Sequence, residues 1–276
     1  MRKRVVVLTY HSQNVSGMTY AANDHLALAE DLPLMGDLGF EVVSALELAT
    51  CLRRGMFDSL PERCIVITMD DGSIFDYQDT PAPPYGTQES MLNILRRQHS
   101  TVLGLHLRRA PYVATAFVIA SESARKQISI GMGNGEWMTE TWWSAAQHSG
   151  YLDIACHSWD HVHPSVVEMN TKPDLVGAFD RIESFEEADK QIAQASRQLR
   201  LVTKSDATRL FAYPFGKTND FLVREYLPRQ KEVIAAFTTA AEPVTKQTGI
   251  WEIPRFVCGH HWRSGDELRR LLSSHT

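Results

Sequence analysis

Short apolar runs rich in β-branched residues alternate with helical patterns along almost the whole chain. The runs at 5–9 and 64–68, VVVLT and CIVIT, lack polar alternation, which is typical of strands buried on both faces of a sheet. Strands that alternate with helices predict a parallel sheet with right-handed crossovers. The expected strands cover 5–9, 41–43, 64–68, 113–119, 151–155, 210–213, 233–237 and 253–257, and the expected helices cover 24–38, 46–54, 139–148, 185–202 and 266–272.

Two of these helices carry clear sequence signals. Asp24 is the expected N-cap of the first, and Gly39 its stop. In the fourth, the apolar residues follow spacings of three and four, as on one face of an amphipathic helix. These residues are Phe185, Ala188, Ile192, Ala195, Leu199 and Val202.

Seven or eight strand–helix units in one chain favour a distorted (β/α)7–8 barrel over an open sheet. No repeat, linker or low-complexity tract divides the chain, so residues 1–276 are expected to form a single α/β domain. The segment 73–112 holds Pro81, Pro83, Pro84 and Gly86 and then a short helical pattern. We expect it to be a long βα loop inserted over the active face.

Composition excludes several classes of protein. The net charge of −5 argues against a broad nucleic-acid-binding surface. The four cysteines lack C-x-x-C spacing, which excludes a zinc ribbon or a thioredoxin motif. No apolar run is long enough to predict a transmembrane segment. The apolar run after Met1-Arg2-Lys3-Arg4 is too short for a signal peptide, so we expect a cytoplasmic location.

Reactive side chains follow the C-terminal ends of the expected strands, where barrel enzymes build their active sites. Scattered surface residues would not be expected to gather in this way. These side chains are His11, Asp70, Asp71, His157, His161, Tyr213, His260 and His261.

The motifs TMDDG (68–72) and HSWDH (157–161) together predict a metal site. His157 and His161 stand at i and i+4, a spacing at which two imidazoles chelate one ion. Asp71 would complete a set of three protein ligands, which suits catalytic Zn²⁺ best, with Co²⁺ or Ni²⁺ as substitutes. Taken singly, the first motif also fits an Asp-Gly turn, and the second a chance histidine pair.

A third motif, FAYPFG (211–216), places Pro214 and a glycine at a strand end. It fits a structural turn, and it also fits a turn whose backbone N–H faces a developing oxyanion.

In their order and spacing these motifs, with ATAFV (114–118), resemble a polysaccharide deacetylase of carbohydrate esterase family 4. The opening LTYH (8–11) and the late Ile253-Pro254-Arg255 resemble the poly-N-acetylglucosamine deacetylase branch. The resemblance covers nearly the whole chain, from His11 to Leu272.

The resemblance implies a distorted barrel that removes N-acetyl groups from sugars with the help of a metal ion. Asp70 would be the catalytic base, and Asp71, His157 and His161 the metal ligands. His11 is our choice for the general acid, with His260 as the rival.

Further roles follow from the same resemblance. The Tyr213 N–H would hold the oxyanion, while Trp159 and Pro214 would contact substrate. Ala212 stands where many members of the family have an arginine that orients the base, and we expect Arg255 to supply that charge.

Two further departures concern Met69 and Ala116, which replace aromatic residues common in the family and indicate tolerable repacking.

The sequence therefore favours a metal-dependent N-deacetylase of an N-acetylated sugar, oligosaccharide or glycan precursor, with a role in surface-glycan biosynthesis. One alternative is an amidohydrolase acting on a small non-sugar amide or cyclic imide. Another is a catalytically silent carbohydrate-binding relative. The presence of every expected metal ligand and of the base argues against it.

Overall fold

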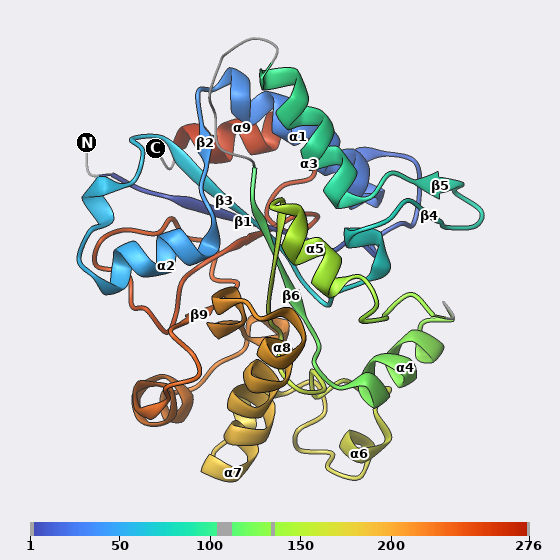
Figure 1. Ribbon diagram of the computed structural model, residues 1–276, viewed down its shortest axis with the longest axis vertical. Coiled ribbons are helices and arrows are strands. Elements are labelled where there is room, and N and C mark those ends of the chain that lie inside the picture. Colours follow the sequence, from blue (N-terminus) through green and yellow to red (C-terminus); the bar gives the residue numbers. More distant parts are fainter. Residues whose placement is uncertain (1–2, 104–111, 134–135, 275–276) are drawn as a thin grey trace.

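The computed structural model describes residues 3–103, 112–133 and 136–274. Its centre is one curled sheet in which every strand pairing is parallel (Figure 1). The strand order is β10 (Phe256–Val257), β1 (Val6–Tyr10), β3 (Cys64–Met69), β6 (Ala114–Val118), β7 (Leu152–Cys156), β8 (Leu210–Ala212) and β9 (Ala235–Phe237), with β2 (Glu41–Val42) paired to the start of β3. Ile253 bridges to Phe237 of β9 just before the chain enters β10 beside β1, so this short segment links the two edges of the sheet. The predicted distorted barrel is confirmed.

Helices surround the sheet (Figure 1). The α-helices are α1 (Asp24–Asp37), α2 (Ala45–Arg53), α3 (Met91–Leu103), α4 (Glu122–Gly131), α5 (Trp143–Ser149), α6 (Val167–Asn170), α7 (Phe185–Ala188), α8 (Ala195–Thr203) and α9 (Gly265–Ser274). Short 3-10 helices are η1 (Tyr20–Ala22), η2 (Phe57–Ser59), η3 (Ile74–Asp76), η4 (Phe179–Arg181), η6 (Asp206–Arg209), η7 (Pro214–Gly216) and η9 (Leu227–Arg229), and η5 (Asp189–Gln194) and η8 (Phe221–Tyr226) are π-helical. Among the described residues, no helix combines the length and apolar character that a membrane crossing requires.

Both faces of the sheet are buried, which explains the continuous apolar runs in the sequence. One face packs against α1, α3, α5, α8 and α9, and its residues include Met69 and Ala116. The other, which we call the inner face, carries Val7, Val66 and Phe117 and packs against α2. Because side chains alternate along a strand, Asp70 falls on the inner face two positions beyond Thr68. The alternation thus places an acidic side chain at the C-terminal end of the strand, on a face that is mostly apolar.

Helix α1 is capped by Asn23 and not by Asp24, which corrects the prediction. The Asn23 side chain accepts the backbone N–H groups of His25 at 2.9 Å and Leu26 at 3.4 Å. Asp24 is instead the first helical residue, and its carboxylate accepts the backbone N–H of His11 at 2.7 Å. Asparagine and aspartate cap helices about equally well, so two adjacent candidates are not separated by residue type.

The amphipathic helix expected over 185–202 is interrupted. Helices α7 and α8 are joined by the π-helical turn η5. A π turn holds one residue more than an α turn, so it shifts the side chains that follow it around the helix. Phe185 and Val202, at the two ends of the expected apolar face, are consequently 44% and 39% exposed.

The segment 73–112 is more ordered than the expected loop. It contains the antiparallel pair β4 (Thr80–Pro81) and β5 (Thr87–Gln88), followed by α3. Helix α3 packs its buried residues, among them Leu92 and Leu95, into the same core as α1. Residues 104–111, which the prediction also covered, lie outside the described residues.

Gly72, in the turn after β3, has a φ of +81°, and a Cβ placed on it would lie 2.6 Å from Val118 Cγ1. We expect Gly72→Ala to lower the free energy of unfolding of the metal-free protein by about 2–5 kcal/mol, since backbone strain and overpacking add. Urea denaturation measures this.

The matched control is Gly36→Ala in α1, where a Cβ meets nothing within 4 Å. This variant is expected to gain about 0.4–1 kcal/mol. Equal stability of the Gly72→Ala variant and the wild type would contradict the assignment of strain to this turn.

Candidate active site

A cavity of about 610 Å³ opens at the C-terminal ends of the strands. It brings together seven of the eight side chains singled out in the sequence, from segments that span most of the chain. These are His11, Asp70, Asp71, His157, His161, His260 and His261. The structure therefore places all of the predicted reactive residues except Tyr213 at one site.

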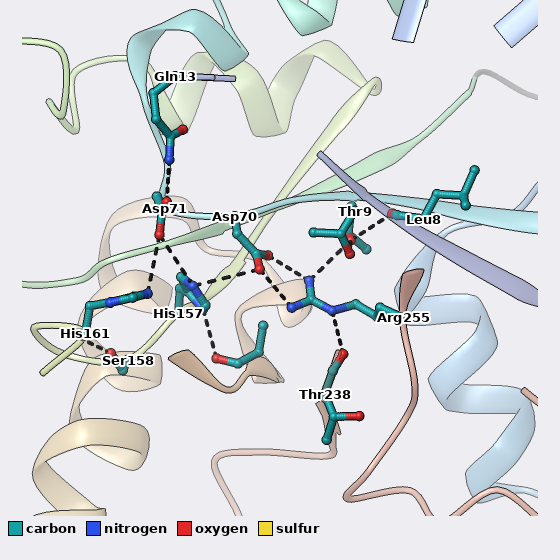
Figure 2. A network of polar contacts seen from close by, with 12 residues as sticks. Leu8, Thr9, Gln13, Asp70, Asp71, His157, Ser158, His161, Thr238 and Arg255 are labelled. Carbon is teal, nitrogen blue, oxygen red and sulfur yellow. Dashed lines mark hydrogen bonds and ion pairs between the residues drawn. The ribbon is translucent and has the colours of Figure 1, made fainter. Parts of the chain in front are cut away.

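Asp71, His157 and His161 form the one group of three or more His, Cys, Asp or Glu residues in the described chain that can hold a metal ion. Asp71 Oδ1 lies 3.6 Å from His157 Nε2 and 3.4 Å from His161 Nε2. Both imidazoles point toward this carboxylate in Figure 2. A carboxylate oxygen and two imidazole nitrogens form a donor set typical of catalytic zinc.

The protonation states of these groups suit metal binding. The Nδ1 atom of His157 lies 2.9 Å from the Ala212 carbonyl oxygen, and donation to it leaves the Nε2 lone pair facing Asp71. Burial, and next the neighbouring His157, lower the pKa of His161 to about 3, so this imidazole is neutral at neutral pH. Burial raises the pKa of Asp71, but the nearby histidines, His161 first, outweigh it and hold that pKa below its usual value.

Asp71 adopts a left-handed backbone conformation, with φ of +74°. The Gln13 side-chain amide donates a hydrogen bond to its Oδ2. This contact leaves Oδ1 to face the two histidines (Figure 2). Gln13 lines the cavity two residues after His11, and no motif in the sequence pointed to it.

Asp70 is held by a fully buried arginine. Arg255 Nη1 and Nη2 donate to the two carboxylate oxygens at 2.7 and 2.8 Å (Figure 2). Arg255 also donates from Nε to the Thr238 carbonyl at 3.1 Å and from Nη1 to Thr68 Oγ1 at 3.3 Å. Burial raises the pKa of Asp70, but the Arg255 charge outweighs it and holds that pKa well below its usual range.

Arg255 thus contacts Asp70 and brings to it a positive charge that Ala212 does not carry. Its predicted part in orienting the base stays a prediction.

The two candidate acids differ in their surroundings. His11 is half-buried, and its Nδ1 is buried without a hydrogen-bond partner in the described structure. His260 lies in the turn after β10 and is exposed. Both line the cavity, so geometry brings both within the site.

The prediction that the Tyr213 N–H faces an oxyanion is wrong. This N–H donates to the Phe237 carbonyl at 3.0 Å, because β8 and β9 continue their ladder one residue beyond the strands. The Tyr213 hydroxyl donates to the Trp251 carbonyl at 3.0 Å. Phe215, two residues later, lines the cavity instead, with its ring centroid 4.5 Å from that of His161.

Trp159 and Pro214, which were expected to contact substrate, are not among the residues that line the cavity. Trp159 is half-buried and packs against the core, and Pro214 is buried. No motif in the sequence pointed to the apolar wall of the cavity, which comes from residues 119–138. Its members are Ile119, Ile128, Met132 and Met138.

Comparisons with known proteins identify a family whose motifs the chain shares and solved structures that have the same fold. The family model described as polysaccharide deacetylase matches residues 58–227, which contain the TMDDG, HSWDH and FAYPFG motifs. His11 and Arg255 lie outside this match. A comparison with curated protein sequences finds no match.

Three solved structures share the fold at low sequence identity. The deacetylase PplD from Streptococcus pyogenes, solved with acetate, is 16% identical, with 99% of each chain covered and a TM-score of 0.67. IcaB from Ammonifex degensii is 18% identical, with 98% of this chain and 96% of that one covered and a TM-score of 0.64. The BpsB deacetylase domain from Bordetella bronchiseptica is 15% identical, with 92% and 96% covered and a TM-score of 0.63.

Arg255→Met would leave the Asp70 carboxylate buried without its partner. We expect the free energy of unfolding of the metal-free protein to fall by about 3–5 kcal/mol at neutral pH. In the wild type, the lowered pKa of Asp70 adds stability above the unfolded carboxyl pKa of about 3.9, and this is lost as the pH falls. In the variant, burial raises the pKa of Asp70, so protonation removes the penalty. The difference between the two proteins therefore shrinks on acidification.

Urea denaturation at about pH 7 and again at about pH 4 measures how this difference changes on acidification. The control is Arg200→Met, which breaks the partly exposed pair with Glu232 and should cost at most about 1 kcal/mol. An Arg255→Met penalty that does not change with pH would contradict the electrostatic explanation.

Proposed function

The chain belongs to the polysaccharide deacetylase family, carbohydrate esterase family 4, and we propose that it is a metal-dependent hydrolase that removes N-acetyl groups from an N-acetylated sugar, oligosaccharide or glycan precursor. One observation carries this proposal. A carboxylate held by a buried arginine lies in the same cavity as an Asp-His-His set that fits a divalent ion. The solved structures of similar fold are deacetylases, which agrees with this activity.

Asp71, His157 and His161 would hold the ion, which is Zn²⁺ by its donor set, with Co²⁺ or Ni²⁺ as substitutes. When bound, such an ion polarises the acetamide carbonyl and lowers the pKa of water. The chain itself supplies a neutral imidazole at His161 and an ionised carboxylate at Asp71, both in the form that binds a metal ion.

Asp70 is the proposed base. Arg255 keeps its carboxylate ionised and holds both oxygens by two parallel hydrogen bonds. Asp70 Oδ2 also lies 3.9 Å from His157 Nε2, so the base borders the proposed ligand set. From this position the Asp70 carboxylate takes the proton of the attacking water. Arg255 acts through Asp70 and is therefore a positioning residue.

The Phe215 N–H replaces the Tyr213 N–H as the proposed oxyanion donor. The neighbouring N–H groups of Gly216 and Lys217 already donate to the carbonyls of Tyr213 and Pro214. Among the described residues, the Phe215 N–H has no protein acceptor. Phe215 lines the cavity, and its left-handed φ of +58° sets the direction of its peptide groups. A free backbone donor at the site fits the needs of acyl transfer.

His11 is preferred over His260 as the general acid. His11 is among the main groups that lower the pKa of both Asp70 and Asp71, and His260 is not among the main causes of either shift. His11 is also the more enclosed of the two. It would donate its proton to the leaving amine. The expected role in surface-glycan biosynthesis and the cytoplasmic location stay predictions.

Release of acetate from a panel of N-acetylated sugars and oligosaccharides tests the activity. We expect release from at least one of them, loss of release with a chelator, and recovery with Zn²⁺ or Co²⁺. Asp70→Asn should bind zinc like the wild type but lose at least about 100-fold in kcat, because the base is absent. Release that survives full metal removal would contradict metal dependence. Cleavage of small amides or imides with no release from any sugar would contradict the proposed substrate.

Substitution of the two candidate acids separates their roles. We expect His11→Asn to lower kcat by about 10²–10⁴-fold, since a positioned general acid contributes about this much. His260→Asn, at an exposed position, should change kcat by less than about tenfold. Steady-state kinetics at saturating zinc measures both. The reverse order of effects would assign the acid to His260.

A further inference from the structure

The loop that carries both histidine ligands has an unusual backbone. Ser158, His161 and Val162 all have positive φ, at 72°, 63° and 42°, and none is glycine. Such conformations cost about 1–3 kcal/mol each and persist only where surrounding structure holds them. For Val162 the conformation is especially rare, because its side chain is β-branched. Something outside the loop must therefore keep it in this shape.

The two histidines are oriented by different means. His157 has a ring hydrogen bond to the Ala212 carbonyl, which fixes the imidazole plane. The Nδ1 atom of His161 is buried without a hydrogen-bond partner among the described residues. No second polar contact therefore fixes the His161 ring, and its direction depends on the backbone of the loop and on packing against Phe215.

A glutamine from a distant helix clamps this loop. Gln191 Nε2 donates to Asp160 Oδ1 at 2.7 Å, and Gln191 Oε1 accepts the Asp160 N–H at 3.4 Å. The same Oδ1 accepts the Val162 N–H at 2.9 Å. These bonds hold Asp160 and Val162, the two residues that flank His161 in the chain. Asp160 and Gln191 are 2% and 4% exposed, so water does not compete freely for them.

The clamp depends on the π-helical turn η5. Gln191, Ile192 and Ala193 are three consecutive buried residues of this turn. In a regular amphipathic helix the buried residues lie on one stripe, at spacings of three and four, so three successive residues are not all buried. The irregular turn thereby brings a polar amide into the interior without losing the packing of Ile192. Turns of this kind are frequent at functional sites.

We propose that Gln191 and Asp160 are positioning residues that hold His161 in its metal-binding direction and so set the metal affinity of the enzyme. The inference rests on the proposed metal site. Neither residue lines the cavity, so neither touches substrate.

Gln191→Met tests the inference by zinc binding, without substrate. Competition of the metal-free protein with a chromophoric chelator gives the Kd for Zn²⁺. We expect Kd to rise by about 10–100-fold, the effect typical of losing an outer-shell partner of a metal ligand. At saturating zinc, kcat should return to within a few-fold of the wild type, since no reacting group has changed.

The chain offers a matched control in Gln147. Its side chain makes a similar pair of bonds at the start of β7: Nε2 donates to Asp153 Oδ1 at 2.8 Å, and Oε1 accepts the N–H of the next residue, Ile154, at 2.9 Å. Gln147→Met should lower stability but leave the zinc Kd unchanged. Thermal unfolding of each metal-free variant separates loss of stability from loss of affinity.

A second variant covers the case in which Gln191→Met does not fold. Gln191→Glu keeps the size and the acceptor for the Asp160 N–H but sets a carboxylate against Asp160, and it should also weaken zinc binding. Combined with Asp160→Asn, Gln191→Met should show a non-additive effect on Kd, because the two residues act as one unit.

Two results would overturn the inference alone: a wild-type zinc Kd in both Gln191 variants, or an equal loss of affinity in Gln147→Met. Failure of the wild type to bind zinc would overturn the proposed metal site and the inference with it.

Discussion

The buried ion pair between Arg255 and Asp70 joins the closure of the barrel to the chemistry of the site. Arg255 lies on the short segment between Ile253, which bridges to β9, and β10, which pairs with β1. Its guanidinium reaches Asp70, which directly follows β3, and is 0% exposed. A buried charge without its partner is strongly destabilising. The two edges of the sheet must therefore meet in one register for both charges to be satisfied, and that register also sets the direction of the proposed base.

The remaining site residues depend on the same sheet. Strand alternation directs Asp70 to the inner face of the sheet, while the turn after β3 carries Asp71 to the two histidines. Ladder bonds between β8 and β9 engage the Tyr213 N–H and leave Phe215 at the cavity. The protein thus builds its site from strand ends and from strained turns just beyond them. Asp71, His161 and Phe215 adopt left-handed backbone conformations, which are unfavourable in free energy but direct these groups toward the site.

Much of the fold could be predicted because the strands are fully buried. Runs such as VVVLT and CIVIT have no other stable place in a chain of this composition, and each became a strand within about one residue of its expected bounds. The errors occur where local signals are degenerate. Asn23 and Asp24 are both good caps, and spacings of three and four do not reveal a π turn. The apolar wall of Ile128 and Met138 carried no signal, because apolar residues near a helix fit a core equally well.

The succession of strands along the chain, the candidate metal ligands and the candidate base could be predicted from residue order, because they depend on short motifs and on regular spacing. Which distant groups meet these residues follows from the folded arrangement. The partner of Asp70 lies 185 residues away, and the clamp on the His161 loop lies 31 residues from Asp160. Which N–H stays free at the FAYPFG turn depended on a neighbouring strand. Contacts of this kind arise from packing and sheet register, which no local pattern of residues specifies.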